Sequence, residues 1–307
     1  MTGPNVSVGL PVYNGERYLA EAIDSILSQD YGDLELIVCD NGSTDATPRI
    51  AADAARRDAR VSVHRSGTNR GAAWNYNRAV ALARGRFFKW AAHDDVLRRG
   101  FLSACVAVLE ERPEVVLAYT RAVDVDDQGR VVHEHDLPRY ATASTPSGRA
   151  RQVLLDPSPC LESFGVIRAD ALRRTRLIGP YTSSDRTLFL ELALLGEFHE
   201  VPEVLFLHRQ HPHRSVHSYA DPRWRNVWFD PAWSGRRSSP RWRLLKEYAT
   251  AVARSPVPPG ERLRTAGLLP LWAASNANAL AREAAAVAVG RARTPGTAMS
   301  TTRVERS

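Results

Sequence analysis

Short apolar runs alternate with helical periodicity along the first half of the chain. Residues 6–10 have the composition of a buried strand, and apolar residues then recur at helical spacing from Tyr18 to Leu27. The alternation continues with strands predicted at residues 34–39, 61–64 and 87–91 and a helix at 72–83. Strands that alternate with helices in this way predict an α/β fold with a mostly parallel central sheet flanked by helices.

Polar loops follow the strands of this predicted sheet. They comprise residues 11–15, 40–45, 69–71 and 93–95. In open parallel sheets, ligands bind beyond the carboxyl ends of the strands, where loops and helix N-termini converge. The pattern therefore predicts a ligand site built from these loops.

The second half of the chain is less regular. It predicts helices at residues 99–112 and 185–195, strands at 115–120, 164–168 and 204–208, a turn at 124–129 and a polar loop at 136–148. From about Pro222, Trp, Arg and Pro become frequent, and Ala-rich helical segments follow. We expect a basic helical extension at residues 216–290 and a disordered tail at 291–307.

The net charge of +7 is unevenly distributed along the chain. Residues 220–307 carry 15 Lys and Arg against 6 Asp and Glu, whereas residues 1–219 carry 26 against 28. A basic segment that contains tryptophan can lie on an anionic membrane surface or bind a phosphorylated acceptor. A merely solvated Arg-rich surface explains the charge equally well. We expect no nucleic-acid partner.

The cysteines and the N-terminus indicate the compartment. Cys39, Cys105 and Cys160 are widely spaced and include no CxxC pair, which argues against a disulfide framework and against a zinc site. The first residues lack the regions of a signal peptide, and no stretch approaches 18 uninterrupted apolar residues. We therefore expect a cytoplasmic protein that does not cross the membrane but can bind peripherally to its inner face.

Asp94 and Asp95 follow the apolar strand at residues 87–91. Adjacent carboxylates repel each other, so their packing needs a cation nearby. Mg²⁺ and Mn²⁺ take oxygen ligands, commonly one or two carboxylates completed by substrate phosphates. A helix cap or an Asx-turn explains the pair equally well when it is considered alone.

Two segments carry a family resemblance. PVYNGERYLAEAIDSILSQDYGDLELIVCDNGSTDAT and NRGAAWNYNRAVALARGRFFKWAAHDD resemble the family 2 glycosyltransferases with the A-type fold. The resemblance is dense from Val6 to about Asp95 and thinner to about Ser215. It implies an A-type domain at residues 1–215, with a nucleotide-binding half at 1–95 and an acceptor half at 96–215. It also implies inverting transfer from a nucleotide-diphosphate sugar, with a UDP-sugar the expected donor, to an acceptor hydroxyl.

The resemblance assigns donor-binding roles to the first three loops. It places the nucleotide base beside Pro11, Tyr13, Asn14 and Asp40, and the diphosphate beside Asn69, Arg70 and Gly71. An exposed carboxylate at a strand end is a good acceptor for a pyrimidine N–H, and a glycine allows close backbone approach. Without the resemblance, Asp40 is better interpreted as a turn-forming residue ahead of Asn-Gly, and a surface Arg is usually just solvated.

The resemblance also divides the roles of the aspartate pair. It implies that Asp94 binds the ribose and Asp95 binds Mn²⁺ or Mg²⁺. Ala92 stands where many relatives have a further acid, so the donor's phosphates must supply metal ligands. The segment from Arg209 to Ser215 resembles the family's RxH segment, which in some relatives gives a third metal ligand or a diphosphate contact, so His211 is a candidate ligand.

His211 belongs to a group of histidines and an arginine, namely His208, Arg209, His211, His213 and His217. The group can be interpreted as a transition-metal site, but the spacing fits no common zinc pattern. A solvated histidine is as good an interpretation of His211 as a metal ligand.

Asp185 is the candidate catalytic base. Leu188, Leu192 and Leu195 follow it on the apolar stripe of the predicted helix, so its carboxylate lies on or beside the face turned toward the protein. A carboxylate at the edge of a cleft can accept the proton of the attacking hydroxyl. Ser184 replaces the first acid of the family's acid pair. The competing interpretation is an N-cap aspartate, although Ser183 and Ser184 can serve that role.

Two other functions compete with glycosyl transfer. A sugar-phosphate nucleotidyltransferase also has an α/β nucleotide domain, but its glycine-rich loop fits PVYNGERY poorly. A non-catalytic nucleotide-sugar-binding protein is conceivable because acids are missing at Ala92 and Ser184. A dinucleotide-binding dehydrogenase is disfavoured because no GxGxxG follows the first strand.

Overall fold

The computed structural model describes residues 3–135, 141–155, 160–212, 214, 222–234 and 239–288. The strands are β1 (Val6–Val12), β2 (Leu34–Asp40), β3 (Val61–Arg65), β4 (Phe87–Trp90), β5 (Val96–Leu97), β6 (Val115–Val125), β7 (Val131–Glu134), β8 (Val166–Arg168) and β9 (Glu197–Arg209). The helices of the first two thirds are α1 (Leu19–Leu27), α2 (Thr47–Arg57), α3 (Ala72–Leu82), α4 (Phe101–Glu111), α5 (Pro146–Leu155), η1 (Leu161–Phe164), α6 (Ala169–Arg173) and α7 (Ser184–Leu195). They are followed by α9 (Pro222–Phe229), η2 (Pro231–Trp233), α10 (Pro240–Arg254), α11 (Pro259–Ala266), α12 (Leu268–Ser275) and α13 (Ala277–Ala288).

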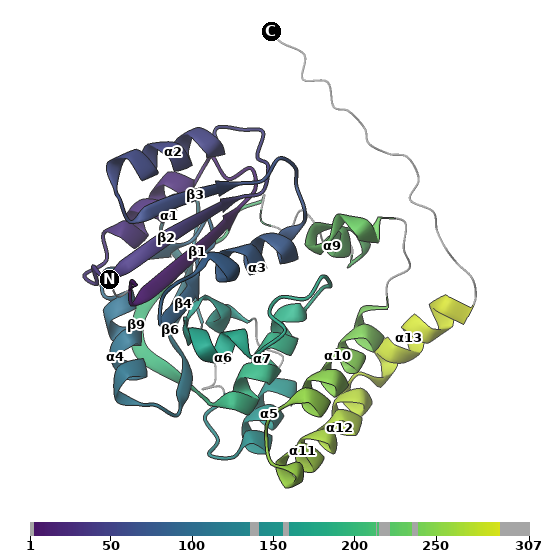
Figure 1. The fold of residues 1–307 in the computed structure, drawn as a ribbon. Coiled ribbons are helices and arrows are strands. Elements are labelled where there is room, and N and C mark those ends of the chain that lie inside the picture. Colours follow the sequence, from purple (N-terminus) through teal and green to yellow (C-terminus); the bar gives the residue numbers. More distant parts are fainter. Residues whose placement is uncertain are drawn as a thin grey trace.

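The strands form one sheet across the described residues (Figure 1), in the order β3-β2-β1-β4-β8-β6-β9-β5 with β7 beside β6. The four N-terminal strands pair in parallel, as do β6 and β9. The remaining pairings are antiparallel, so the second half of the sheet is mixed. The predicted α/β fold, a central sheet flanked by helices with further helices at the C-terminal end, is confirmed.

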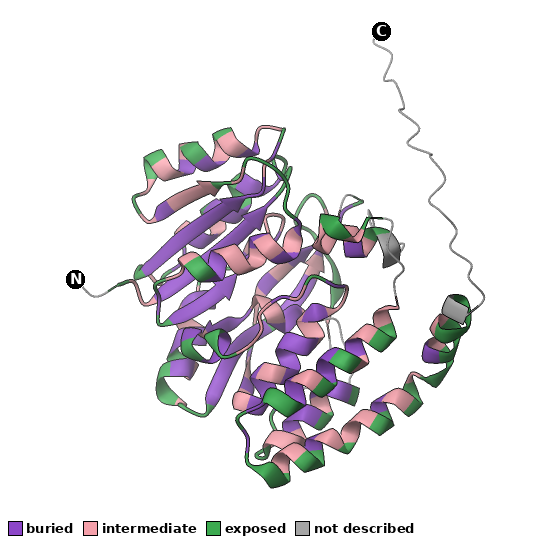
Figure 2. Cartoon of the chain, turned by 45° about the vertical axis from the view of Figure 1, so that its right-hand side comes forward, coloured by how far each residue is buried: buried purple, intermediate pink, exposed green. Residues whose placement is uncertain are grey.

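Helices cover both faces of the sheet, and every residue of β1, β2 and β4 is buried (Figure 2). The hairpin strand β7 is exposed. β2 shows how the sequence achieves burial on both faces, because Leu36 and Val38 pack in the cluster beneath α1, α2 and α4, while Ile37 and Cys39 pack in the cluster beneath α3 and α7. Successive side chains of a strand point to opposite faces, so a continuous apolar run serves both cores.

The C-terminal helices continue one of these two cores. Leu244, Tyr248 and Trp272 of α10 and α12 are buried in the same cluster as the apolar residues of α5 and α7. The rings of Tyr248 and Trp272 meet edge to face, with centroids 5.4 Å apart. The basic extension therefore packs against the sheet domain. The predicted boundary at residue 215 and the tail at 291–307 lie outside the described residues.

The strands β6 and β9 extend well beyond their predicted bounds. β9 continues through Pro202, where the register with β6 shifts beyond Thr120. Proline lacks an N–H and is tolerated at such irregularities. β6 extends to Val125, so the turn predicted from Asp124 begins instead at Asp126, whose N–H donates to the Arg130 carbonyl at 2.9 Å.

Among the residues that the structure describes, no helix combines the length and the apolar character that a membrane span requires.

Gly9 provides a test of how tightly α3 packs on β1. An added Cβ at Gly9 would lie 2.6 Å from Ala79 Cβ and 2.8 Å from Phe88 Cζ, inside van der Waals contact. We expect Gly9→Ala to lower the free energy of unfolding by about 1–3 kcal/mol, measured by urea denaturation. Gly32→Ala is the control, because nothing lies within 4 Å of its added Cβ. Equal stability of the two variants would contradict this account of the packing.

Candidate functional site

The loops after β1 and β2 are tied together at the carboxyl edge of the sheet. The Asn14 N–H donates to Ser43 Oγ at 2.9 Å, and Asn14 Oδ1 accepts the Thr44 N–H at 2.9 Å. Asn14 has φ of 50°, a left-handed conformation that asparagine tolerates better than most residues. Pro11 lies within β1, and Tyr13 is exposed beside Asn14. The structure thus brings the predicted base-binding residues of these two loops together.

Asn41 joins the loop before α3 to the same edge. Its side-chain amide donates to Asn69 Oδ1 at 2.9 Å and to the Gly71 carbonyl at 3.1 Å, while its Oδ1 accepts the Arg70 N–H at 3.0 Å. A buried asparagine that satisfies three partners in another loop fixes the distance between the two loops. Three of the four predicted loops therefore form one connected surface.

Asp40 does not have the exposed position that the sequence suggested. Its side chain is completely buried, because the following turn and the Arg65 side chain cover the end of β2. Oδ1 accepts the Ser43 N–H at 2.9 Å, and Oδ2 lies 3.2 Å from Arg65 Nε. The expectation of an exposed carboxylate is wrong, and the turn-forming role is present.

Gly71 also differs from its predicted surroundings. It has φ of 88°, and an added Cβ would lie 2.5 Å from the Phe229 carbonyl oxygen and 2.8 Å from Pro231 Cδ. The close backbone approach at Gly71 is thus to the segment of α9 and η2, which lies beside α3 (Figure 1). Arg70 is exposed, with its guanidinium 4.1 Å from the centre of the Trp74 ring.

Asp94 and Asp95 lie at the end of β4 and contact the end of β9. Asp94 Oδ2 is 3.0 Å from His211 Nε2, and Asp95 Oδ1 accepts the Arg209 N–H at 2.9 Å. Asp95 is buried, and the Asp94 side chain is 14% exposed. The structure therefore brings His211 to the aspartate pair, with Asp94 rather than Asp95 as its direct partner.

The two carboxylates differ in their electrostatic environment. Burial opposes ionisation of Asp94, but the hydrogen bond with His211 and the charges of His93, His211 and Arg214 outweigh burial and lower the pKa of Asp94. Burial, and then the negative charge of Asp94, raise the pKa of Asp95. A second negative charge is thus costly here unless a cation is added. The pair suits a cation that takes oxygen ligands.

The Arg209 side chain links the aspartate pair to neighbouring elements. Its buried guanidinium donates to the Asp94 carbonyl at 3.0 Å and to the carbonyls of Asp126 and Asp127, both at 3.2 Å. It also donates to Glu21 Oε2 at 2.7 Å. One side chain therefore connects the loop after β4, the turn after β6 and helix α1. The sequence placed Arg209 in the RxH segment but gave no sign of this role.

Asp185 stands in the first turn of α7, at the same end of the sheet. Burial raises its pKa, while the N–H of Arg186 and the Cys160 thiol, as hydrogen-bond donors, partly offset burial. Tyr76 of α3 lies near enough to all three aspartates to be affected by their charges. Burial raises the pKa of Tyr76 most, and the negative charges of Asp94, Asp95 and Asp185 raise it further.

Two further residues near the site escaped the sequence interpretation. Lys89 is completely buried in β4 and donates to the Trp90 carbonyl at 3.0 Å, and burial lowers its pKa to about 7. A lysine within an apolar strand is a signal that could have been noticed. Tyr76 lies between two asparagines on α3, a pattern that gives no specific indication.

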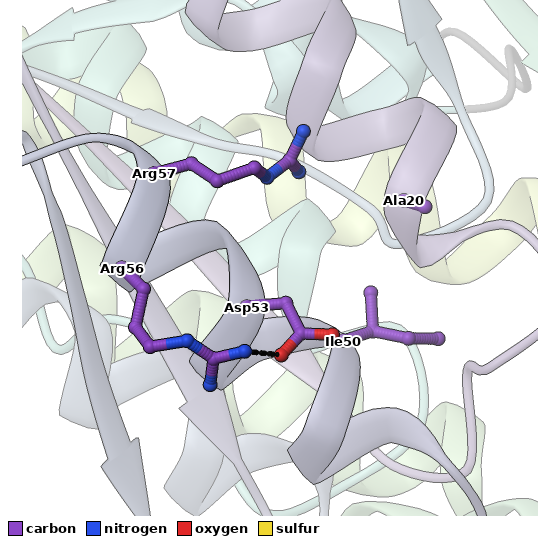
Figure 3. A pocket seen from close by; sticks show the side chains of 5 residues that line it. All are labelled: Ala20, Ile50, Asp53, Arg56 and Arg57. Atoms are coloured by element: carbon purple, nitrogen blue, oxygen red, sulfur yellow. Dashed lines mark hydrogen bonds and ion pairs between the residues drawn. The ribbon is translucent and has the colours of Figure 1, made fainter.

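The histidine-rich group does not form one site. His211 faces Asp94, whereas His208 Nδ1 lies 2.7 Å from Asp124 Oδ1. His213 and His217 lie outside the described residues. A surface hollow between α1 and α2 is also unrelated to the candidate site, since it is lined by Ala20, Ile50, Asp53, Arg56 and Arg57 (Figure 3).

Comparison with known proteins gives a consistent result. The family model for Glycosyl transferase family 2 matches residues 7–175. EpsE of Bacillus subtilis is 39% identical over 129 residues, which are 42% of this chain and 46% of EpsE. Chondroitin synthase of Escherichia coli is 27% identical over 206 residues, which are 66% of this chain and 28% of that protein. The chain thus spans less than half the length of these two relatives.

Two solved structures share the fold. Residues 1–349 of S. aureus TarS in complex with UDP-GlcNAc align with a TM-score of 0.58 and 17% identity, over 93% of this chain and 92% of that one. The mannosyltransferase PcManGT from Pyrobaculum calidifontis, in complex with GDP-Man and Mn²⁺, aligns with a TM-score of 0.56 and 21% identity, over 95% and 76% of the two chains.

Arg209 gives a stability prediction with a matched control. Arg209→Met leaves buried carbonyl groups and the Glu21 carboxylate without their donor, so we expect the free energy of unfolding to fall by about 2–4 kcal/mol. Arg17→Met removes a half-exposed guanidinium that also contacts Asp127, at 2.9 Å, and should cost at most about 1 kcal/mol. Urea denaturation measures both. A smaller loss in Arg209→Met than in the control would refute this role of Arg209.

Proposed function

The chain belongs to glycosyl transferase family 2, and on that premise we propose that it transfers a sugar from a nucleotide-diphosphate sugar to an acceptor hydroxyl, with inversion at the anomeric carbon. The observation that supports this best is the meeting of Asp94, Asp95 and His211 at the carboxyl edge of the sheet. Asp185 lies near the same edge, since its charge and those of the aspartate pair all act on Tyr76. Carboxylates, an imidazole and a candidate base at one edge suit both diphosphate departure and proton removal.

The donor is proposed to lie across the loops after β1, β2 and β3. Pro11, Tyr13 and Asn14 would frame the base, while the buried Asp40 holds the adjoining turn through Ser43. Asn69, Arg70 and Gly71 would border the diphosphate. Arg70 supports this placement, since its guanidinium is exposed and stacked on Trp74. Asp94 would accept the ribose hydroxyls. The TarS complex contains UDP-GlcNAc and the PcManGT complex contains GDP-Man, and a UDP-sugar remains the donor that we expect here.

The residues at the aspartate pair fit a divalent cation. Asp95 offers a carboxylate whose ionisation is disfavoured by burial and by Asp94, so a cation would relieve that cost. His211 offers an imidazole, a ligand that Mn²⁺ accepts alongside oxygen atoms. We propose that Asp95 and His211 hold Mn²⁺ or Mg²⁺ with the donor's phosphates. When bound, the ion would neutralise charge on the leaving diphosphate.

Asp185 is proposed to act as the base. Its carboxylate would accept the proton of the acceptor hydroxyl while that oxygen forms a bond to the anomeric carbon. The bond between that carbon and the diphosphate oxygen breaks at the same time. Burial favours this role because it raises the pKa of Asp185 toward the pH at which the enzyme works. Ser184 is buried beside it and supplies no second acid.

Asp185→Asn tests the assignment of the base. We expect it to lower kcat by about 10²–10⁴-fold, measured as release of nucleoside diphosphate from a panel of UDP- and GDP-sugars with Mn²⁺. Because the base must be ionised, wild-type kcat/KM should rise with pH. The midpoint of the acidic limb of this pH profile should lie above the ordinary aspartate pKa of about 3.9.

Two variants accompany that measurement. Asp170→Asn changes an exposed aspartate of α6 and should leave turnover unchanged. Asp95→Ala should abolish both turnover and the thermal shift that donor and Mn²⁺ produce, because a bound ligand stabilises the folded state by mass action. Asp185→Asn should keep the thermal shift. Donor binding without any turnover in the wild-type protein would favour the non-catalytic alternative, and normal turnover in Asp185→Asn would exclude Asp185 as the base.

We further propose that the basic C-terminal helices contact an anionic membrane surface. Large apolar side chains are exposed there among the described residues, with Trp242 47% and Leu271 50% exposed. Exposed Arg241 and Lys246 lie on the same helix as Trp242. The buried Glu247 of that helix is already paired with Arg176 and Arg243. Aromatic and basic side chains together favour an anionic lipid surface.

Vesicle co-sedimentation tests the membrane contact. The wild-type protein should bind vesicles that contain phosphatidylglycerol and lose binding as salt rises. The double variant Arg241→Gln/Lys246→Gln should weaken binding roughly tenfold or more, since each basic residue contributes about 1 kcal/mol. The control Arg49→Gln/Arg56→Gln removes two exposed charges from α2, which is distant in sequence from the C-terminal helices, and should not affect vesicle binding. Equal binding to neutral vesicles would contradict the proposal.

A further inference from the structure

Asp124, His135 and His208 form a cluster outside the proposed donor site. Asp124 Oδ1 lies 2.8 Å from His135 Nε2 and 2.7 Å from His208 Nδ1. One ligand atom from each of the three residues lies within 4.8 Å of the other two. The three side chains are only 10–13% exposed. Two imidazoles and a carboxylate are thus gathered around one small volume that solvent still reaches.

The sheet itself holds this cluster in place. Asp124 of β6 is the register partner of His208 in β9, and the hairpin from β6 to β7 brings His135 back, with its N–H 3.4 Å from the Ala122 carbonyl. A register irregularity at Asp124 and Val125 marks the same point. Bulges often re-aim side chains at functional positions. The cluster is therefore built by backbone pairing and not by the chance meeting of mobile surface side chains.

The electrostatics suit a metal. Burial opposes ionisation of Asp124, but its hydrogen bonds with His135 and His208 lower its pKa, so it carries a negative charge at neutral pH. Burial, and then the charge of Arg214, lower the pKa of His208, which favours the neutral imidazole. An ionised carboxylate and a neutral imidazole are the forms that bind metals.

We propose that Asp124, His135 and His208 form a transition-metal site of the zinc type, separate from the divalent-cation site at Asp95. Two imidazoles and one carboxylate are a common protein ligand set for zinc, with a fourth position left to water. Ligands at about 2.0–2.1 Å from a tetrahedral ion lie about 3.3 Å apart. Asp124 Oδ1 therefore needs to move only about half an ångström away from each imidazole nitrogen, which now lie 2.8 and 2.7 Å from it.

Arg214 competes with a metal ion for His208. Its guanidinium contacts Nε2 of His208, so this nitrogen accepts and the ring proton lies on Nδ1, facing Asp124. A metal on Nδ1 moves that proton to Nε2, and an arginine cannot give up a proton to accommodate it. Zinc binding therefore displaces Arg214. The charge of Arg214 also helps to lower the pKa of Asp94 and partly offsets the raised pKa of Asp95, so Arg214 acts on both sites.

Zinc titration of the chelator-treated full-length protein tests the proposal without donor or activity. We expect one zinc per chain by calorimetry. His135→Ala and the isosteric Asp124→Asn should each weaken binding at least tenfold. Arg214→Gln should strengthen it, because the competing guanidinium is gone. Replacing zinc with Co²⁺ should give the strong visible absorption of a four-coordinate ion, which His135→Ala abolishes.

Matched controls separate this site from the proposed donor site. His133→Ala removes an exposed ring whose centroid lies 4.9 Å from that of His135, and zinc affinity should stay unchanged. Asp95→Ala should also retain the zinc. Thermal melts of each variant confirm that it is folded. The proposal is overturned if the wild-type protein binds no zinc, if Asp95→Ala loses it, or if folded His135→Ala and Asp124→Asn bind as tightly as wild type.

Discussion

The buried guanidinium of Arg209 is the contact on which the geometry of the candidate site depends. Its donors reach Asp94, the turn at Asp126 and Asp127, and Glu21 on α1, while its own N–H binds Asp95. The Tyr18 ring lies beneath it, with the guanidinium carbon 4.8 Å from the ring centre. A buried cation must have its donors satisfied, and here the acceptors are the backbone of the site itself. The charge thereby fixes loops that would otherwise be free to move.

The two adjacent carboxylates at this edge make different contacts. Asp94 faces His211, and Asp95 faces the backbone of β9, so their acceptor atoms are directed to different donors. Each carboxylate keeps capacity for a ligand, since one hydrogen bond does not exhaust its two oxygens. Burial and mutual repulsion make the pair costly without a cation. A metal ion bound together with the diphosphate would relieve this electrostatic cost.

The sequence predicted the sheet and the convergence of its loops, because both follow from the local alternation of apolar and polar residues. It could not predict burial of Asp40, which depends on Arg65 from another strand. It named His208 but missed its grouping with Asp124 and His135, since the proximity of His208 to Asp124 arises from strand register across more than 80 residues. Zinc spacing rules describe ligands that are close in sequence. Long-range register is the information that a pattern along the chain does not contain.

The segment of α9 and η2 shows why the C-terminal extension matters to the site. Its backbone closes over Gly71, and Asn226 Oδ1 accepts the Thr182 N–H at 3.0 Å and the Thr182 hydroxyl at 2.8 Å, just before α7. The Trp233 indole Nε1–H also donates to the Pro180 carbonyl at 2.8 Å. One short segment thus contacts both the loop proposed to border the diphosphate and the loop that leads to Asp185. Movement of this segment would affect both loops, because it packs on Gly71 and also hydrogen-bonds Pro180 and Thr182.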